Sequence, residues 1–155
     1  MVDLDVAYIP TPKPIVKQML RLAKVRKDEV LYDLGAGDGR ILVEAVRGFG
    51  ARAAGIEIDP DRVLRIKERL KSTNVDAEVI QADLMEVDLS PANVVTMYLS
   101  DSVNARLAPK LRRELNPGTR VVSLDYALPG WLPEKELRVK GGGLERTIFL
   151  YEVQQ

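Results

Sequence analysis

Short apolar runs, rich in β-branched residues, alternate along most of the chain with amphipathic segments. The apolar runs are predicted to be β-strands and cover residues 29–34, 51–58, 77–81, 93–98 and 119–125. They are apolar almost throughout, which is typical of strands covered on both faces of a sheet. Strands and helices that alternate at this pitch predict an α/β, Rossmann-like fold with a parallel sheet and right-handed crossovers.

Apolar residues at helical spacing fill the segments between these strands. One helix is predicted over 39–49, and a second begins at Asp59, an N-cap residue followed by a first-turn proline. A third helix is expected to begin at Asp101 or Ser102, and Pro109 is expected to kink or split it.

The two ends of the chain depart from this alternation. Residues 8–12 predict a stiff extended segment, and a lead-in helix with a regular apolar side follows it. Residues 136–140 and 144–153 predict an antiparallel hairpin with three glycines at its turn, so that the sheet becomes mostly parallel with an antiparallel end. We expect one domain over 1–155, made of an N-terminal segment (1–28), a βα core (29–125) and a C-terminal hairpin (126–155).

The composition excludes several kinds of chemistry. The chain has no histidine and no cysteine, which rules out disulfides, thiolate nucleophiles, Ser-His-Asp triads and zinc sites with sulfur or imidazole ligands. Twenty-three basic residues balance 23 acidic ones, so the sequence has no built-in attraction to nucleic acid.

No apolar run approaches the roughly 20 residues of a membrane span, and no signal-peptide pattern opens the chain, so a cytoplasmic protein is expected. Abundant charge without cysteine also suits a thermophile.

A glycine-rich loop joins the first predicted strand to the first helix of the core. It reads Asp-Leu-Gly-Ala-Gly-Asp-Gly over 33–39, in the crevice where open α/β sheets bind ligands. One glycine would suffice for a tight turn, whereas three glycines interleaved with Asp33 and Asp38 indicate close approach to a ligand. A dinucleotide fingerprint would have glycine in place of Arg40, and the two aspartates would repel a pyrophosphate. They suit a cationic ligand such as S-adenosylmethionine, which has an ammonium group and a sulfonium.

Two further acids follow the next predicted strands. Glu57 ends the second strand about 20 residues after the loop, where an acid typically bonds both ribose hydroxyls of a nucleotide. Asp83 ends the third strand, where its carboxylate is placed to accept a hydrogen bond from an adenine amino group. A single acid at a strand end would be explained as a helix cap. Acids at the ends of the first three strands indicate a ligand.

These motifs resemble those of class I, or seven-β-strand, S-adenosylmethionine-dependent methyltransferases. The matching segments are 33–39, 55–59 (Gly-Ile-Glu-Ile-Asp) and 81–83 (Gln-Ala-Asp). Further segments resemble the archaeal broad-specificity protein lysine methyltransferases, namely 8–12, 86–90, 94–99 and 111–123. The resemblance implies S-adenosylmethionine as cofactor, no metal, and protein substrates that present surface lysines. It assigns cofactor binding to Asp33, Gly35, Ala36, Gly37, Asp38, Glu57, Ile58, Asp83 and Leu84.

The sequence indicates fewer residues for the part of the site that would bind the methyl acceptor. Amino-methylating enzymes that act on adenine or amide nitrogens usually have Asn/Asp-Pro-Pro-Tyr after the fourth strand, and this chain has Met-Tyr-Leu-Ser over 97–100. Tyr98 is expected to line the acceptor pocket, together with Tyr8, while Thr11 either folds over the cofactor or caps the lead-in helix. Trp131 is expected to pack beneath the hairpin, and the alternative is that it lies at the edge of the substrate entrance.

Two other functions stay open at this point. One is a methyltransferase for RNA or a small molecule, since the fold accepts many substrates. The other is a non-catalytic S-adenosylmethionine-binding module that regulates a partner. Balanced charge disfavours RNA, and the lack of an inserted capping domain disfavours a small buried substrate. A monomer that acts on side chains protruding from larger proteins is therefore the leading expectation.

Overall fold

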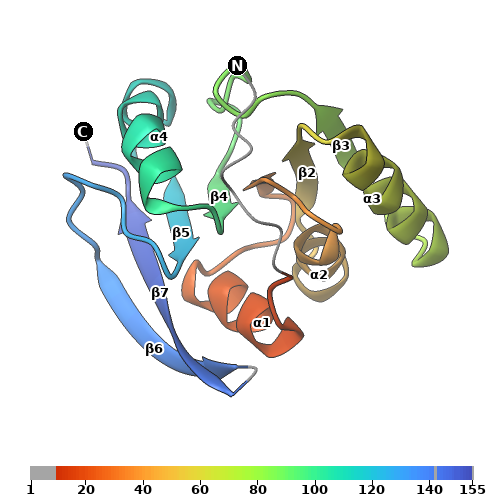
Figure 1. The fold of residues 1–155 in the computed structure, drawn as a ribbon, viewed down its shortest axis with the longest axis horizontal. Helices are drawn as coiled ribbons and strands as arrows, with labels where there is room; N and C mark the ends of the chain where they lie inside the picture. Colours follow the sequence, from red (N-terminus) through yellow and green to blue (C-terminus); the bar gives the residue numbers. More distant parts are fainter. Residues whose placement is uncertain (1–9, 142, 155) are drawn as a thin grey trace.

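Seven strands and four helices are formed by residues 10–141 and 143–154, which are the residues that the computed structural model describes (Figure 1). The strands are β1 (Val30–Leu34), β2 (Arg52–Glu57), β3 (Glu78–Gln81), β4 (Val94–Met97), β5 (Arg120–Leu124), β6 (Lys135–Gly141) and β7 (Leu144–Glu152). The helices are α1 (Lys13–Leu22), α2 (Arg40–Phe49), α3 (Pro60–Ser72) and α4 (Asp101–Glu114).

All seven strands belong to one sheet in the order β3-β2-β1-β4-β5-β7-β6. Strands β1 to β5 run parallel, whereas β7 pairs antiparallel with both β5 and β6. The predicted mostly parallel sheet with an antiparallel C-terminal hairpin is confirmed. In the centre, Asp33 of β1 is in register with Gly55 of β2 and Thr96 of β4, so the carboxyl ends of these strands meet along one edge.

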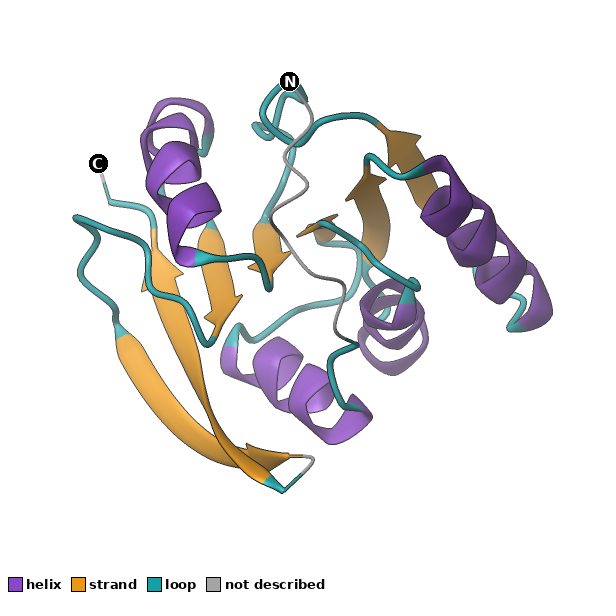
Figure 2. Ribbon diagram, in the orientation of Figure 1, coloured by secondary structure: helices purple, strands orange, loops and turns teal. Residues whose placement is uncertain are grey.

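Two hydrophobic layers cover the sheet. Leu31 and Val94 belong to the layer that includes the buried sides of α1, α2 and α3. Leu34 and Met97 belong to the opposite layer, with α4. Because side chains alternate along a strand, continuous apolar runs fill both layers. Figure 2 shows loops alone between β3 and β4 and between β5 and β6, so no helix follows β3 or β5 in the described chain.

Helix ends agree with the sequence patterns in part. Asp59 caps α3 by accepting a hydrogen bond from the Asp61 N–H at 2.9 Å, as predicted. The cap of α4 is Ser100, one residue before the predicted candidates, and its hydroxyl accepts from the Val103 N–H at 3.2 Å. The α4 helix does not split at Pro109, because its apolar side is buried along its whole length and holds the helix together.

The hairpin folds back onto the lead-in helix. Gly141, at the end of β6, lies against Ile15 of α1, and a Cβ atom at Gly141 would be 2.3 Å from the Ile15 Cδ1 atom. Only glycine therefore permits this close approach. Within the described residues, no helix is both long and apolar enough to cross a bilayer.

Candidate active site

A pocket opens where β1, β2, β3 and β4 end, the place that the sequence indicated. Each predicted cofactor-binding residue contributes to its lining, namely Asp33, Gly35, Ala36, Gly37, Asp38, Glu57, Ile58, Asp83 and Leu84. Tyr98 lines it too, whereas Tyr8 lies outside the described residues. Thr11 is buried and lines the pocket, and it does not cap α1, whose N-cap is Pro12.

The glycine loop is held against β2 by its own backbone. The N–H groups of Gly35 and Ala36 donate to the Ile56 carbonyl at 2.8 and 3.1 Å. Gly35, Gly37 and Gly39 have φ angles of 73°, 62° and 82°, which disfavour any residue with a Cβ atom. The loop therefore keeps its backbone close to the pocket, without side chains at these three positions.

Glu57 is the acid around which the pocket is organised. Its side chain is 4% exposed, and its Oε1 atom accepts a hydrogen bond from the Gly37 N–H at 3.0 Å. Its Oε2 atom accepts from the Asp59 N–H at 3.1 Å. A carboxylate can accept about four hydrogen bonds, so two acceptor positions stay available for a pair of hydroxyl groups.

Asp33 is a fully buried acid in the same pocket. The Thr96 hydroxyl donates to its Oδ1 atom at 2.8 Å. Burial raises the pKa of Asp33 from its ordinary 3.8 to about 7, and the charges of Glu57 and Asp38 add to the effect, while the bond from Thr96 opposes it. A cationic group placed beside Asp33 would favour its ionised form, which suits this position to a ligand with an ammonium group.

Asn in place of Asp33 is expected to stabilise the ligand-free protein by about 1–3 kcal/mol at pH 8. Because the pKa in the folded state is raised, the folded chain holds a proton that the unfolded chain has already lost between about pH 4 and pH 7. The contribution of Asp33 to stability therefore falls as pH rises through this range, and the Asn variant loses that dependence. Urea unfolding at pH 5 and pH 8 measures both effects, with Glu68→Gln on the exposed face of α3 as the control. Equal stability of Asp33→Asn and the natural chain at pH 8 would contradict the assigned pKa.

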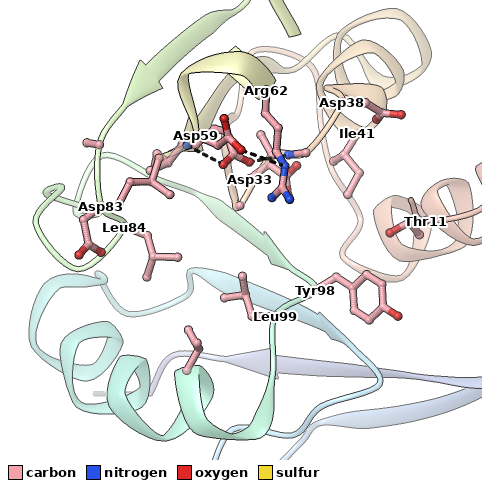
Figure 3. Close-up of a pocket in the computed structure, with 18 of the residues that line it drawn as sticks. Thr11, Asp33, Asp38, Ile41, Asp59, Arg62, Asp83, Leu84, Tyr98 and Leu99 are labelled. Atoms are coloured by element: carbon pink, nitrogen blue, oxygen red, sulfur yellow. Dashed lines mark hydrogen bonds and ion pairs between the residues drawn. The ribbon is translucent and has the colours of Figure 1, made fainter. Parts of the chain in front are cut away.

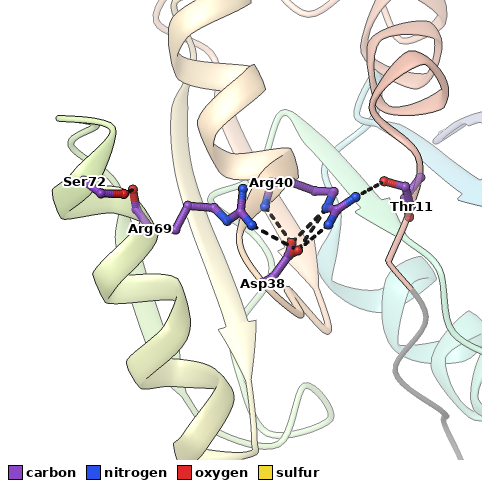
Figure 4. Close-up of polar contacts among 5 residues, drawn as sticks. All are labelled: Thr11, Asp38, Arg40, Arg69 and Ser72. Carbon is purple, nitrogen blue, oxygen red and sulfur yellow. Dashed lines mark hydrogen bonds and ion pairs between the residues drawn. The ribbon is translucent and has the colours of Figure 1, made fainter.

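Asp38 is engaged by two arginines (Figure 4). The Arg40 guanidinium makes a short ion pair with it, with Nη2 2.6 Å from Oδ2, and Arg69 of α3 lies 3.3 Å from the same oxygen. Burial works to raise the pKa of Asp38, but the hydrogen bonds and charges of these arginines outweigh it and the pKa is lowered. Arg40 also donates from Nη1 to the Thr11 carbonyl at 2.9 Å. Asp38 thus links the glycine loop to α3 and to the segment before α1.

The pocket has two distinct ends (Figure 3). Asp83 and Leu84 lie at one end, and Tyr98 and Thr11 lie at the other, with Asp33 between them. The carboxylate of Asp83 accepts from the Met85 N–H at 2.9 Å, which fixes the turn after β3. A long ligand that spans the pocket would therefore contact the acids in the order in which their strands lie in the sheet.

Several lining residues were not identified from the sequence. They come from the starts of helices and from the strand ends, namely Arg40, Ile41, Arg62, Leu99, Val103 and Arg106. No motif marks such positions, although each follows a predicted strand end by eight residues or fewer. Trp131 packs edge-on against Tyr151 of β7, with ring centroids 5.9 Å apart, in agreement with the role expected for it at the hairpin.

Comparisons with known proteins agree in finding similarity to methyltransferases. The family described as "ANTKMT methyltransferase domain" matches residues 33–135. A protein-lysine N-methyltransferase of Saccharolobus islandicus (strain REY15A) is 42% identical over 151 residues, or 96% of this chain and 94% of that protein. The mouse adenine nucleotide translocase lysine N-methyltransferase is 34% identical to this chain. The aligned region covers 97% of this chain and 64% of the mouse protein.

A similar solved structure carries a different description. It is the crystal structure of an RNA methyltransferase from Salinibacter ruber in complex with S-adenosyl-L-homocysteine. It is 46% identical, has a TM-score of 0.90, and covers 95% of each chain. S-adenosyl-L-homocysteine is the demethylated form of S-adenosylmethionine, so a protein similar to this chain over nearly its full length binds the product form of the cofactor that the acids of the pocket suit.

Proposed function

The chain belongs to the ANTKMT methyltransferase family, and we propose that it transfers the methyl group of S-adenosylmethionine to lysine side chains of proteins. The observation that carries the proposal is the buried Glu57 carboxylate, held by the glycine loop at the edge where four strands end. This arrangement occurs in a chain that resembles a protein-lysine N-methyltransferase over nearly its full length.

We assign the two ends of the pocket to the two halves of the cofactor. Asp83 and Leu84 bind the adenine, and Glu57, with Ile58 beside it, accepts hydrogen bonds from the ribose hydroxyls. The backbone of Gly35, Ala36 and Gly37 lies along the methionine portion. These assignments leave Tyr98 at the acceptor end of the pocket.

Asp33 and Asp38 have different roles in this proposal. Asp33, whose carboxylate has only the Thr96 hydroxyl as a hydrogen-bond partner among the described residues, faces the ammonium group of the cofactor. Asp38 acts indirectly. Arg40 and Arg69 neutralise its negative charge, and the two ion pairs hold the loop in place. Its contribution is to hold the loop in the shape that binds the methionine portion.

The reaction needs little acid–base assistance from the protein. When bound, S-adenosylmethionine supplies an already activated methyl group on a positively charged sulfur. An acceptor lysine has a reference pKa of about 10.4, and desolvation beside a positive charge lowers it, so that the neutral amine forms in the site. The residues of the pocket contribute by orientation, which can supply roughly 7–11 kcal/mol of a reaction barrier. This explains how a chain without histidine can catalyse the transfer.

With saturating cofactor and subsaturating acceptor, the methylation rate is expected to rise about tenfold or more between pH 7 and pH 9. The neutral fraction of a lysine increases with pH throughout this range, and no histidine of the enzyme titrates near pH 6.5. Initial rates with a lysine-containing protein, measured in buffers of constant ionic strength, test this. A rate that is flat from pH 7 to pH 9 would show that amine deprotonation does not control transfer.

The identity of the acceptor is tested by labelling. Radiolabelled S-adenosylmethionine and a heat-treated cell extract are incubated with the enzyme, and portions are treated with nuclease or protease before electrophoresis. Mass spectrometry of the labelled protein should find methyllysine. Label that disappears with nuclease would instead favour RNA, the acceptor named for the Salinibacter ruber structure. Cofactor binding without label on any macromolecule would favour a regulatory module.

We further propose that residues 1–155 form one methyltransferase domain, with 29–125 as its cofactor-binding core and 126–155 as its hairpin end. We expect the protein to be a cytoplasmic monomer adapted to high temperature. Cell fractionation, gel filtration with light scattering and thermal melting test these three properties in turn.

A further inference from the structure

Tyr98, at the acceptor end of the pocket, is stacked on a second tyrosine, Tyr126. Tyr98 follows β4 and Tyr126 follows β5, and these strands are parallel neighbours in the sheet. Their rings are stacked, with centroids 6.2 Å apart and planes 22° apart. Burial raises the pKa of Tyr98, so its ring is uncharged at neutral pH. The Tyr98 ring, backed by Tyr126, forms an aromatic surface beside the position assigned to the reacting group.

The turn that carries Tyr126 is fixed by three elements. From α4, the fully buried Asn104 donates from Nδ2 to the carbonyls of Tyr126 and the next residue, both at 3.1 Å. At the end of β5, the Ser123 hydroxyl donates to the Tyr126 carbonyl. From β7, the Thr147 N–H donates to Asp125 Oδ1 at 3.1 Å, and the Asp125 N–H donates to the Thr147 carbonyl at 2.7 Å. Asp125 has a φ of 65°, so these bonds hold a backbone conformation that is uncommon outside glycine.

Arg146 of β7 joins this turn to Tyr98. Its Nε atom donates to Asp125 Oδ2 at 2.7 Å, and its guanidinium carbon lies 5.1 Å from the centre of the Tyr98 ring. The residue is only 9% exposed. Its Nη2 group is buried and has no hydrogen-bond partner within the described part of the chain. A buried guanidinium costs stability relative to apolar packing of similar volume, so its position between Asp125 and the Tyr98 ring points to a role in the site.

We propose that Arg146 is a positioning residue for the acceptor, because it holds Tyr98 and Tyr126 as the surface on which the stem of the incoming lysine packs. The inference deepens the proposed function and rests on it. An aromatic face accommodates the apolar stem of a lysine. The charged and titratable groups around the Tyr98 ring are Arg146, Asp125 and Tyr126. Arg146 contacts the Tyr98 ring and, through its bond to Asp125, also holds the turn that carries Tyr126.

Replacement of Arg146 by methionine tests this role, because it keeps an apolar stem but removes the charge and the bond to Asp125. The catalytic efficiency kcat/KM toward a lysine-containing protein is expected to fall about tenfold or more, mainly through a higher KM for the acceptor. The dissociation constant for S-adenosylmethionine, measured by calorimetry, should stay within about twofold. Arg146→Lys keeps a cation near Tyr98 and should recover part of the loss.

Arg138→Met is the matched control. Arg138 belongs to the same hairpin, and its ion pair with Glu145 is exposed and does not contact the pocket. The acceptor KM of this variant should equal that of the natural chain. A melting temperature for each variant separates loss of folding from loss of acceptor binding.

Tyr126→Ala provides a second route if Arg146→Met fails to fold. It should raise the acceptor KM and leave cofactor affinity unchanged, and Tyr126→Phe should behave as the natural chain. The inference is overturned if both folded variants keep the natural kcat/KM, or if cofactor affinity falls as much as acceptor turnover. If the natural enzyme itself labels nucleic acid and not lysine, the proposed function fails, which the same assay shows independently of the variants.

Discussion

A valine in place of Gly37 is expected to abolish S-adenosylmethionine binding and methyl transfer. Gly37 has a φ of 62°, and a β-branched residue is strongly disfavoured there. Its N–H donates to Glu57 Oε1, so any shift of the backbone to relieve the strain also breaks this bond. The added side chain would enter the space next to the loop. We expect a loss of affinity of at least about 3 kcal/mol, or more than a hundredfold, measured by calorimetric titration.

Gly118→Val is the control for backbone strain alone. Gly118 has a φ of 89°, and a Cβ atom there would meet nothing within 4 Å. It lies in the turn before β5, outside the pocket. Gly118→Val should therefore lower the melting temperature and leave the affinity of the folded protein unchanged. Normal methyl transfer by folded Gly37→Val would remove the loop from the site.

Replacement of Glu57 by alanine is expected to weaken S-adenosylmethionine binding by about 1.5–3 kcal/mol, which is roughly 10- to 100-fold. The variant removes the acceptors assigned to the ribose hydroxyls. It also leaves the buried N–H groups of Gly37 and Asp59 without the partner they have in the natural chain. Calorimetric titration gives the affinity, and circular dichroism shows whether the variant is folded.

Glu29→Ala is the corresponding control at the opposite edge of the sheet. Glu29 precedes β1 and is paired with Arg120 at 2.6 Å, outside the pocket. Its removal should reduce stability and leave cofactor affinity unchanged. Affinity equal to that of the natural chain in folded Glu57→Ala would show that Glu57 does not contact the cofactor.

Much of the fold can be predicted from local patterns in the sequence. The five parallel strands, the hairpin and the cap at Asp59 were each predicted from apolar periodicity and from turn or cap residues, and the structure has them. The glycine loop was located because a strand end, three glycines and two acids coincide within seven residues. The order of the strands was not predicted, because it depends on the direction of each crossover and not on any local pattern.

The features missed at the site depend on contacts between distant segments. The pairing of Asp38 with Arg69 could not be predicted, because it joins residues 31 positions apart on different elements. Arg146 is one of several charged residues in the hairpin, and nothing in its neighbourhood marks it as buried. Its partner Asp125 follows β5, and β5 lies beside β7 only in the folded sheet.

The contact of Gly141 with Ile15 bears on how the enzyme is made in the cell. A ribosome releases α1 before the β6–β7 hairpin, so the part of α1 that packs on β6 stays uncovered until the hairpin has been made. Pro10 and Thr11, which line the pocket, directly precede α1. In the nascent chain, the helix that follows these two lining residues therefore gains its full support only after the hairpin has joined the sheet.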